Sequence, residues 1–111
     1  MTSEAQAKFV NSKEFSRLLS KNTLVVVNYT VNWYGPCSVV TSSIEKLAEE
    51  YGKIVKIVKI DVDENPDIVK KYGICSIPAV SVFRDRKVRE SLFGIQPYEI
   101  YRNILETQLK L

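Results

Sequence analysis

The sequence predicts one α/β domain in which helices cover both faces of a β-sheet. Short apolar, β-branched runs alternate along the chain with segments of helical periodicity, which is the pattern of such a sandwich. The composition, with 45% hydrophobic and 26% charged residues and only 4 Gly and 4 Pro, is that of an ordinary globular chain. Because 111 residues suffice for one hydrophobic core and not for two domains of ordinary size, we expect residues 1–111 to form a single domain.

The first three elements are expected to be a strand, a helix and a strand. Residues 7–10 are typical of a short first strand. Asn11 and Glu14 have the spacing of a capping box, which predicts that a helix begins there, with apolar residues recurring three and four positions apart. From Leu24 to Tyr29 the apolar residues stand at consecutive positions, which indicates a strand covered on both faces in the middle of the sheet.

The next three elements are expected to be a helix, a strand and a short helix. Pro36 suits the first helical position, because its missing N–H would be unpaired there, and we expect this helix to end at Gly52 in a left-handed cap. Alternating apolar and polar residues predict a strand over residues 54–62. A short helix follows over residues 65–72 and is expected to end at Gly73.

The last three elements are expected to be a β-hairpin and a helix. Strands over residues 79–83 and 88–93 are joined across residues 85–87, close enough for an antiparallel hairpin. The final helix starts near Pro97. Since strands separated by helices need crossovers, the first three strands should be parallel, and the hairpin should add an antiparallel edge.

The composition excludes several classes of function. Histidine is absent, which excludes Ser–His and Cys–His nucleophile pairs, and Cys37 and Cys75 alone are too few for a structural zinc site, so we expect no metal. The net charge is +3 with the two signs interspersed, so we expect no basic face for nucleic acid. The longest apolar run has four residues and no signal pattern is present, so we expect no membrane association and a cytoplasmic protein.

In an open sheet of this kind, active and binding sites lie in the loops that follow the central strands. That rule points to Trp33 through Cys37, after the second strand. Cys37 would lie in the first turn of a helix, where unpaired amides and the helix dipole favour a thiolate. Because free cysteine is also among the most buried residue types, an inert buried Cys37 remains an equal alternative on position alone.

At these residues the chain resembles the thioredoxin family. Residues 33–37, Trp-Tyr-Gly-Pro-Cys, look like the family's Trp-Cys-Gly-Pro-Cys, residues 63–66 like the turn into its third helix, and residues 71–78 like the segment leading to its cis-proline. The resemblance implies a thioredoxin fold: a five-stranded mixed sheet of order 1-3-2-4-5 flanked by four helices. It also implies that Pro78 is cis and lies beside the Cys37 loop.

The main departure from the family is Tyr34, which replaces the first, attacking cysteine of the motif. A phenol cannot form a disulfide, so the usual two-thiol cycle cannot run. Cys37 matches the family's resolving cysteine and is our candidate for a single catalytic thiol. The mixed disulfide it forms would be released by an outside thiol such as glutathione or by Cys75, for which an unpaired thiol without a role is the alternative.

Three further departures lie near the same site. Asn28 stands where the family usually has a buried aspartate that moves protons for the resolving cysteine, and an amide takes up no proton at neutral pH. Lys59, the neighbour of that aspartate in the family, would lose its ionic partner. Ser42 replaces the proline that kinks the family's second helix.

The resemblance leaves the family's recognition surface intact and implies partners that are protein segments bound in extended form beside the cis-proline. Two hypotheses follow: a monothiol protein of thiol–disulfide redox homeostasis, and a redox-inactive module that only binds protein. We expect a monomer without a cofactor, with glutathione as external reductant. The residues matching the recognition surface are Trp33, Tyr34, Gly35, Pro36, Ile77, Pro78, Gly94 and Ile95.

Overall fold

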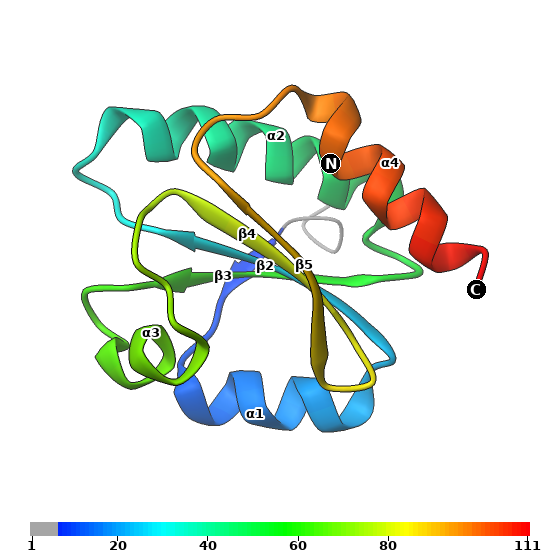
Figure 1. Ribbon diagram of the computed structural model, residues 1–111, viewed down its shortest axis with the longest axis horizontal. Helices are drawn as coiled ribbons and strands as arrows, with labels where there is room; N and C mark the ends of the chain where they lie inside the picture. The colour runs from blue at the N-terminus through cyan, green and yellow to red at the C-terminus, as the bar shows by residue number, and fades with distance from the viewer. Residues whose placement is uncertain (1–6) are drawn as a thin grey trace.

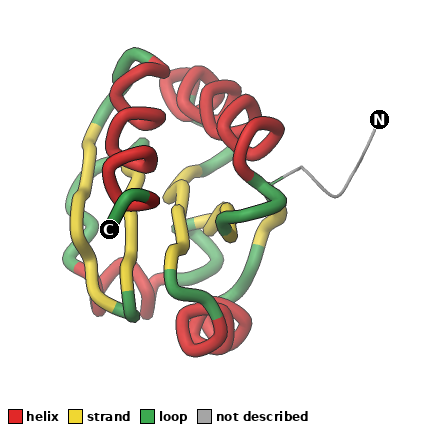
Figure 2. The backbone as a smooth tube through the Cα atoms, turned by 90° about the vertical axis from the view of Figure 1, so that its right-hand side faces the viewer, coloured by secondary structure: helices red, strands yellow, loops and turns green. Residues whose placement is uncertain are grey.

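The computed structural model describes residues 7–111 and contains one five-stranded sheet between two pairs of helices. The strand order is β1-β3-β2-β4-β5. Helices α2 and α4 cover one face of the sheet, and α1 and α3 cover the other (Figure 1). The view along the sheet in Figure 2 shows helices on both sides of the strands. This is the thioredoxin fold that the family resemblance implied.

The elements follow the predicted order. Their bounds are β1 Lys8–Phe9, α1 Ser12–Lys21, β2 Leu24–Thr30, α2 Gly35–Tyr51, β3 Lys56–Asp61, α3 Pro66–Tyr72, β4 Ala79–Arg84, β5 Lys87–Phe93 and α4 Tyr98–Leu109. Strand β3 pairs in parallel with both β1 and β2, whereas β4 runs antiparallel to β2 and β5. The predicted crossover pattern and the antiparallel edge are therefore confirmed.

Helix α1 begins with the predicted capping box. The Asn11 side chain accepts a hydrogen bond from the Glu14 backbone N–H at 2.9 Å. The Glu14 carboxylate in turn accepts one from the Asn11 N–H at 3.0 Å. Two backbone donors that the helix itself leaves unpaired are thus satisfied, which fixes where the chain turns from β1 into α1.

Helix α2 ends at Tyr51 with Gly52 as its C-cap, as predicted, but the conformation of this cap was predicted wrongly. Gly52 has φ −62° and ψ −17°, which is right-handed, so it is not the expected left-handed cap. The chain instead continues through a further turn, in which the N–H groups of Ile54 and Val55 both donate to the carbonyl of Tyr51. This turn uses up the first residues of the expected strand, and β3 therefore begins at Lys56. At the end of α3 the expectation is confirmed, because Gly73 has φ +63°.

The hairpin between β4 and β5 has a shorter loop than predicted. Only Asp85 and Arg86 lie in the turn, and Lys87 already pairs with Arg84 in the ladder. Both turn residues have positive φ, 52° and 69°, which is the signature of a type I′ turn. Neither is a glycine, the residue that adopts this conformation without steric cost.

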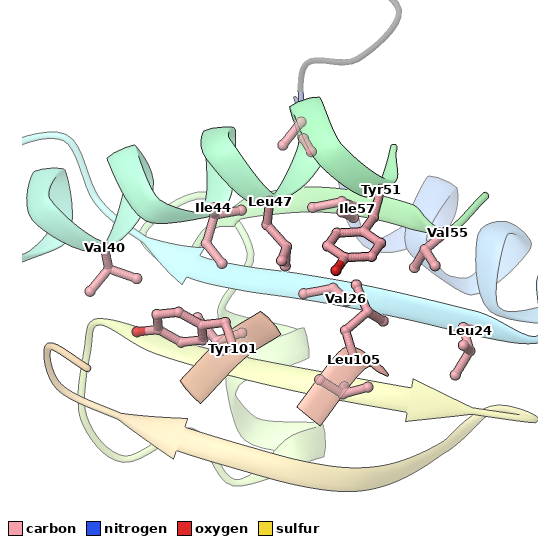
Figure 3. Close-up of a cluster of buried hydrophobic side chains, with 14 residues drawn as sticks. Leu24, Val26, Val40, Ile44, Leu47, Tyr51, Val55, Ile57, Tyr101 and Leu105 are labelled. Atoms are coloured by element: carbon pink, nitrogen blue, oxygen red, sulfur yellow. The ribbon is translucent and has the colours of Figure 1, made fainter. Parts of the chain in front are cut away.

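The core lies on both faces of β2, whose seven residues are all buried. Val25, Val27 and Tyr29 face α1 and α3, and among them Phe15 meets Phe83 edge to face at 5.4 Å. On the other face the apolar side chains of α2 point toward the sheet, as Figure 3 shows. The labelled side chains of this cluster are Leu24, Val26, Val40, Ile44, Leu47, Tyr51, Val55, Ile57, Tyr101 and Leu105. The consecutive apolar run of β2 is thus explained by burial from two sides.

Within residues 7–111 no helix is long and apolar enough to cross a membrane. The same part of the chain contains no group of three or more His, Cys, Asp or Glu side chains that could hold a metal ion.

Candidate functional site

The candidate site lies where β2 ends and α2 begins. The connection between them is the loop at one end of the sheet, at the left of Figure 1. Strand β2 is the central strand, so this loop emerges from the middle of the sheet, between β3 on one side and β4 on the other. The register pairs Tyr29 of β2 with Ala79 of β4, which brings the segment before β4 next to the segment after β2. The fold therefore joins the 33–37 motif to the loop that contains Pro78.

Cys37 is the third residue of α2 and is 0% exposed. Its N–H donates to the carbonyl of Tyr34 at 3.0 Å, closing the first turn of the helix. Pro36 precedes it at a position where the lack of an N–H leaves no intrahelical hydrogen bond unmade. The prediction that Cys37 lies in this turn is confirmed. Its sulfur, however, is covered by protein, as expected for the family's resolving cysteine rather than for an attacking thiol.

The two aromatic residues of the motif are exposed. Trp33 is 68% and Tyr34 is 41% exposed, and their rings lie 6.0 Å apart at an angle of 50°. The Trp33 indole N–H donates to the carboxylate of Asp63 at 2.7 Å. Asp63 is itself held, because its backbone N–H donates to the Asp61 carboxylate at 2.9 Å. The loop after β3 thus fixes an aromatic side chain that would otherwise move freely in solvent.

The loop before β4 contains the cis-proline. The Ile77–Pro78 peptide bond is cis, which confirms the expectation from the family resemblance. The carbonyl of Pro78 accepts a hydrogen bond from the Gly94 N–H at 2.8 Å, which ties this loop to the end of β5. Gly94 has φ +77°, a conformation that a residue with a Cβ rarely adopts. Pro78 is buried, Ile77 is half-buried and Ile95 is exposed, so part of this segment is open to a partner.

Cys75 is exposed and lines a shallow hollow of about 310 Å³ between α3 and the cis-proline loop. Asp63, the partner of Trp33, lies in the same hollow. Cys37 and Cys75 are both free thiols in this structure. The hollow is lined by Val62, Asp63, Pro66, Val69, Ile74, Cys75, Ser76 and Ile77. The motif, Cys75 and Ile77 therefore border one continuous surface.

Beneath the motif, Asn28 lies on β2 and is 0% exposed. Its amide nitrogen donates to the Thr41 hydroxyl at 3.2 Å, and its Oδ1 has no hydrogen-bond partner within the described residues. No carboxylate occupies this position, so the proton acceptor expected of the family is replaced by a neutral, half-satisfied amide. One residue further along β2, on the opposite face of the sheet, burial raises the pKa of the Tyr29 phenol, so this group stays protonated at neutral pH.

Lys59 pairs in register with Asn28, so it lacks the aspartate that neighbours it in the family, as expected, but it has another ionic partner. Its ammonium lies 2.9 Å from the Glu45 carboxylate of α2. The other oxygen of that carboxylate accepts the Ala7 N–H at 3.2 Å. Sequence reasoning missed this pairing, because Glu45 lies fourteen residues away on a helix whose rotation about its axis is set by packing. Lys59 is therefore a structural link between β3 and α2.

The fold and the loop geometry define a protein of the thioredoxin-fold class. The family model "Thioredoxin" matches residues 6–106. Thioredoxin from Bacillus subtilis is 38% identical over 86 residues, covering 78% of this chain and 83% of its own, and that of Griffithsia pacifica is 31% identical over 104 residues, covering 94% and 95%. The structure of thioredoxin from Trypanosoma brucei brucei superposes with a TM-score of 0.87 at 27% identity, covering 100% of this chain and 98% of its own.

A second solved structure, of a mutant thioredoxin from Halobacterium salinarum, has a TM-score of 0.86 at 28% identity, covering 96% of this chain and 94% of its own. The chain belongs to the thioredoxin family. Membership carries a general role in thiol–disulfide redox chemistry, and the family needs no cofactor for it.

Proposed function

We propose that this protein holds an extended segment of a partner protein against the cis-proline loop and exchanges its disulfide through a single thiol, Cys37. The observation that carries the proposal is the joint position of Cys37, in the first turn of α2, and cis-Pro78, in the loop beside it. Backbone groups beside a cis-proline loop are suited to pair with an added strand. Exposed Trp33 and Tyr34 supply the rigid aromatic contacts on which such interfaces depend.

The exchange requires two molecules of an outside thiol, for which glutathione is the candidate. The Cys37 thiolate attacks one sulfur of the partner's disulfide, forming a mixed disulfide and releasing the partner's other sulfur as a thiolate. A glutathione thiolate then attacks the Cys37 sulfur, which frees the partner and leaves Cys37 joined to glutathione. A second glutathione restores Cys37, so the balance is one disulfide reduced to two thiols and two glutathiones oxidised to one disulfide. Cys75 can attack the Cys37 sulfur in place of the first glutathione only if the two sulfurs come within bonding reach. The Cys37–Cys75 disulfide formed in that step is then reduced by two glutathiones, so the overall balance is the same.

The complete burial of Cys37 favours a second candidate, a module that binds protein without chemistry. In that case Tyr34 enlarges the contact surface at the position of the missing nucleophile. Asn28 without a carboxylate is consistent with both candidates, since neither a monothiol exchange resolved by glutathione nor simple binding needs a buried proton acceptor. The two candidates share one binding surface and differ only in whether Cys37 becomes accessible to a partner.

The accessibility of Cys37 separates the candidates. In a Cys75→Ser variant, only Cys37 reacts with iodoacetamide, and its rate is measured across pH in the native protein. The first candidate predicts a reaction much faster than global unfolding. It also predicts reduction of insulin by glutathione in the presence of the protein, at a rate that Cys37→Ser abolishes.

If Cys37 reacts with iodoacetamide only upon unfolding, and insulin is reduced no faster than with the Cys37→Ser control, the exchange candidate is refuted. The binding module is then the candidate that stands. For that module, Trp33→Ala and Pro78→Ala should weaken binding of an unfolded, carboxymethylated insulin B chain. Cys37→Ser should leave it unchanged. Equal binding by all three variants would remove the cis-proline surface from both candidates.

A further inference from the structure

Basic side chains gather at the end of the sheet opposite to the candidate site. Four separate parts of the chain meet there: the end of α1, the connection from α2 to β3, the β4–β5 hairpin and the end of α4, at the right of Figure 1. They carry seven of the sixteen Lys and Arg residues, which we call the basic end: Lys21, Lys53, Lys56, Arg84, Arg86, Lys87 and Lys110. The charges are interspersed along the sequence, but the fold brings cations from its separate parts together.

Three adjoining hollows run across the basic end. The first, of about 450 Å³, lies between β1, β3 and α1 and includes Arg17 and Lys56. The second, of about 340 Å³, shares Lys56 and adds Lys21 and Arg84. The third, of about 180 Å³, shares Lys21 and adds Arg86. Because neighbouring hollows share a lysine, they form one continuous basic track rather than three isolated depressions.

The lysines of this track form no ion pair with an Asp or Glu side chain of the described residues. Within residues 7–111 the only Asp or Glu carboxylate within 4 Å of a Lys or Arg nitrogen is that of Glu45 beside Lys59, which lies outside the track. Arg84 differs from the lysines, because its guanidinium donates to the backbone oxygens of Gln108 at 2.9 Å and Leu111 at 3.5 Å. Glu14 borders the first hollow, but one of its oxygens already caps α1. In the part of the chain that the structure describes, two acidic residues lie among the parts that meet at the basic end: Asp85 in the hairpin turn, and Glu106 in the last turn of α4, whose carboxylate accepts a hydrogen bond from the Tyr51 hydroxyl. A cluster of like charges repels itself, and a bound anionic partner removes that repulsion.

Exposed apolar side chains border the same track. Phe9 is 56% exposed in the first hollow, and Ile54 is 69% exposed in the second, beside Leu109. An occupant that satisfies both features carries negative charge and apolar groups at short intervals. An extended acidic polypeptide does so, because its side chains alternate between two faces. Nucleic acid fits less well, since among the described residues Phe9 is the one aromatic side chain that lines these hollows, and successive bases need a series of aromatic rings to stack on. A flat bilayer does not enter hollows.

The opposite end of the molecule is acidic. Asp61 is the last residue of β3, Asp63 and Glu64 follow it beside Trp33, and Asp67 lies in the first turn of α3. A polyacidic segment is therefore repelled from the candidate site and attracted to the other end of the sheet. We propose that the basic end binds an extended acidic segment of a partner protein, with glutamate or aspartate side chains against the lysines that the hollows share and apolar side chains in the hollows. This surface is independent of Cys37 and of the proposed exchange.

A fluorescein-labelled peptide of ten alternating Glu and Val residues tests the proposal. Extended, it spans about 33 Å, close to the 32 Å longest dimension of the protein. Binding is measured by fluorescence anisotropy at low and at physiological salt. We expect saturable binding that weakens as salt rises, and weaker binding of a ten-residue Glu peptide, which lacks the apolar side chains.

Two double variants localise the binding. Lys21→Glu with Lys56→Glu should weaken it at least tenfold. The matched control is Lys13→Glu with Lys70→Glu, two exposed lysines outside the track, which should weaken it less than threefold. Each Lys→Glu substitution lowers the net charge by two, so two of them take both double variants from +3 to −1. The two variants therefore differ only in where the changed charges lie. Circular dichroism and thermal unfolding confirm that both fold.

Equal losses in the two double variants would overturn the proposal, because net charge alone would then explain the binding. Tighter binding of a 20-base-pair DNA duplex, or of phosphatidylserine vesicles, than of the peptide would overturn it in favour of those partners. Loss of peptide binding in Trp33→Ala would overturn it by placing the peptide on the cis-proline loop instead. Unchanged affinity in Trp33→Ala and in Cys37→Ser supports a separate site, whatever the outcome of the redox assays.

Discussion

Asn28→Asp replaces the amide nitrogen of a buried side chain by an oxygen, so it introduces an acid and changes almost nothing in volume. Asn28 is fully buried, and the Thr41 hydroxyl is its only side-chain partner within the described residues. A carboxylate at this point has one neutral donor to replace its hydration, because the ammonium of Lys59, its register partner on β3, is already paired with Glu45. We therefore expect burial to raise its folded-state pKa by about two to three units above the ordinary value of about 4.

The sign of the effect follows from which state holds the proton. Below about pH 4 the introduced carboxyl group is protonated in the folded and the unfolded chain alike, and the substitution costs little. Above about pH 4 the unfolded chain loses this proton while the folded chain retains it. The free energy of unfolding then falls until the pH passes the raised folded-state pKa. At about 1.4 kcal/mol per pKa unit, we expect the variant to lose about 3 to 4 kcal/mol of stability, relative to the unchanged chain, between about pH 4 and pH 8.

Urea unfolding followed by circular dichroism at about pH 4, 6 and 8 measures this loss. Asn32→Asp is the matched control, because Asn32 is exposed in the loop that follows β2. The same chemical change there should alter stability by less than about 0.5 kcal/mol at each pH. Identical pH profiles for the two variants would refute the reasoning. The site beneath Cys37 would then be hydrated rather than dry.

Three further predictions concern the motif, the core and a helix end. Tyr34→Cys introduces a second thiol into the motif that contains Cys37. It should raise the rate of insulin reduction by dithiothreitol at least about 100-fold above that of the unchanged chain, since the mixed disulfide is then resolved within the motif. No increase would show that the cis-proline surface does not accept insulin. Phe15→Ala should cost about 3 to 5 kcal/mol in urea unfolding, because its ring packs against Phe83 in the core; a much smaller loss would mean that neighbouring side chains refill the cavity. Gly73→Ala should cost about 1 kcal/mol by the same assay, because φ is +63° there, and a neutral result would mean that the loop relaxes.

Most of the fold could be predicted from the sequence because local and global preferences agree. The apolar run of β2 is buried on both faces, and the capping box at Asn11 starts a helix where the pattern indicates one. The failures occurred where local chemistry permits two outcomes. Gly52 can end a helix in either hand, and its right-handed turn delays β3 by two residues. In the β4–β5 turn, Asp85 and Arg86 both adopt positive φ. Because the segment contains no Gly, its sequence does not predict this conformation.

The site was predictable in its positions and less so in its contacts. The cis peptide at Pro78 and the place of Cys37 in the first turn of α2 follow the resemblance to the thioredoxin family. The hydrogen bond from the Trp33 indole and the ion pair of Lys59 join residues on different elements. Such contacts depend on how elements rotate and pack, which periodicity does not determine. The basic end escaped prediction for the same reason.

The turn between β4 and β5 combines steric strain with a positive charge. Arg86 adopts φ +69°, a backbone conformation that costs an L-amino acid with a Cβ about 1 kcal/mol more free energy than it costs glycine. The turn is thus less stable than one formed by an Asn-Gly pair, which adopts positive φ at lower cost. What it retains in return is a guanidinium at the tip of the hairpin, beside the end of α1, where a glycine would leave the third hollow with one cation fewer.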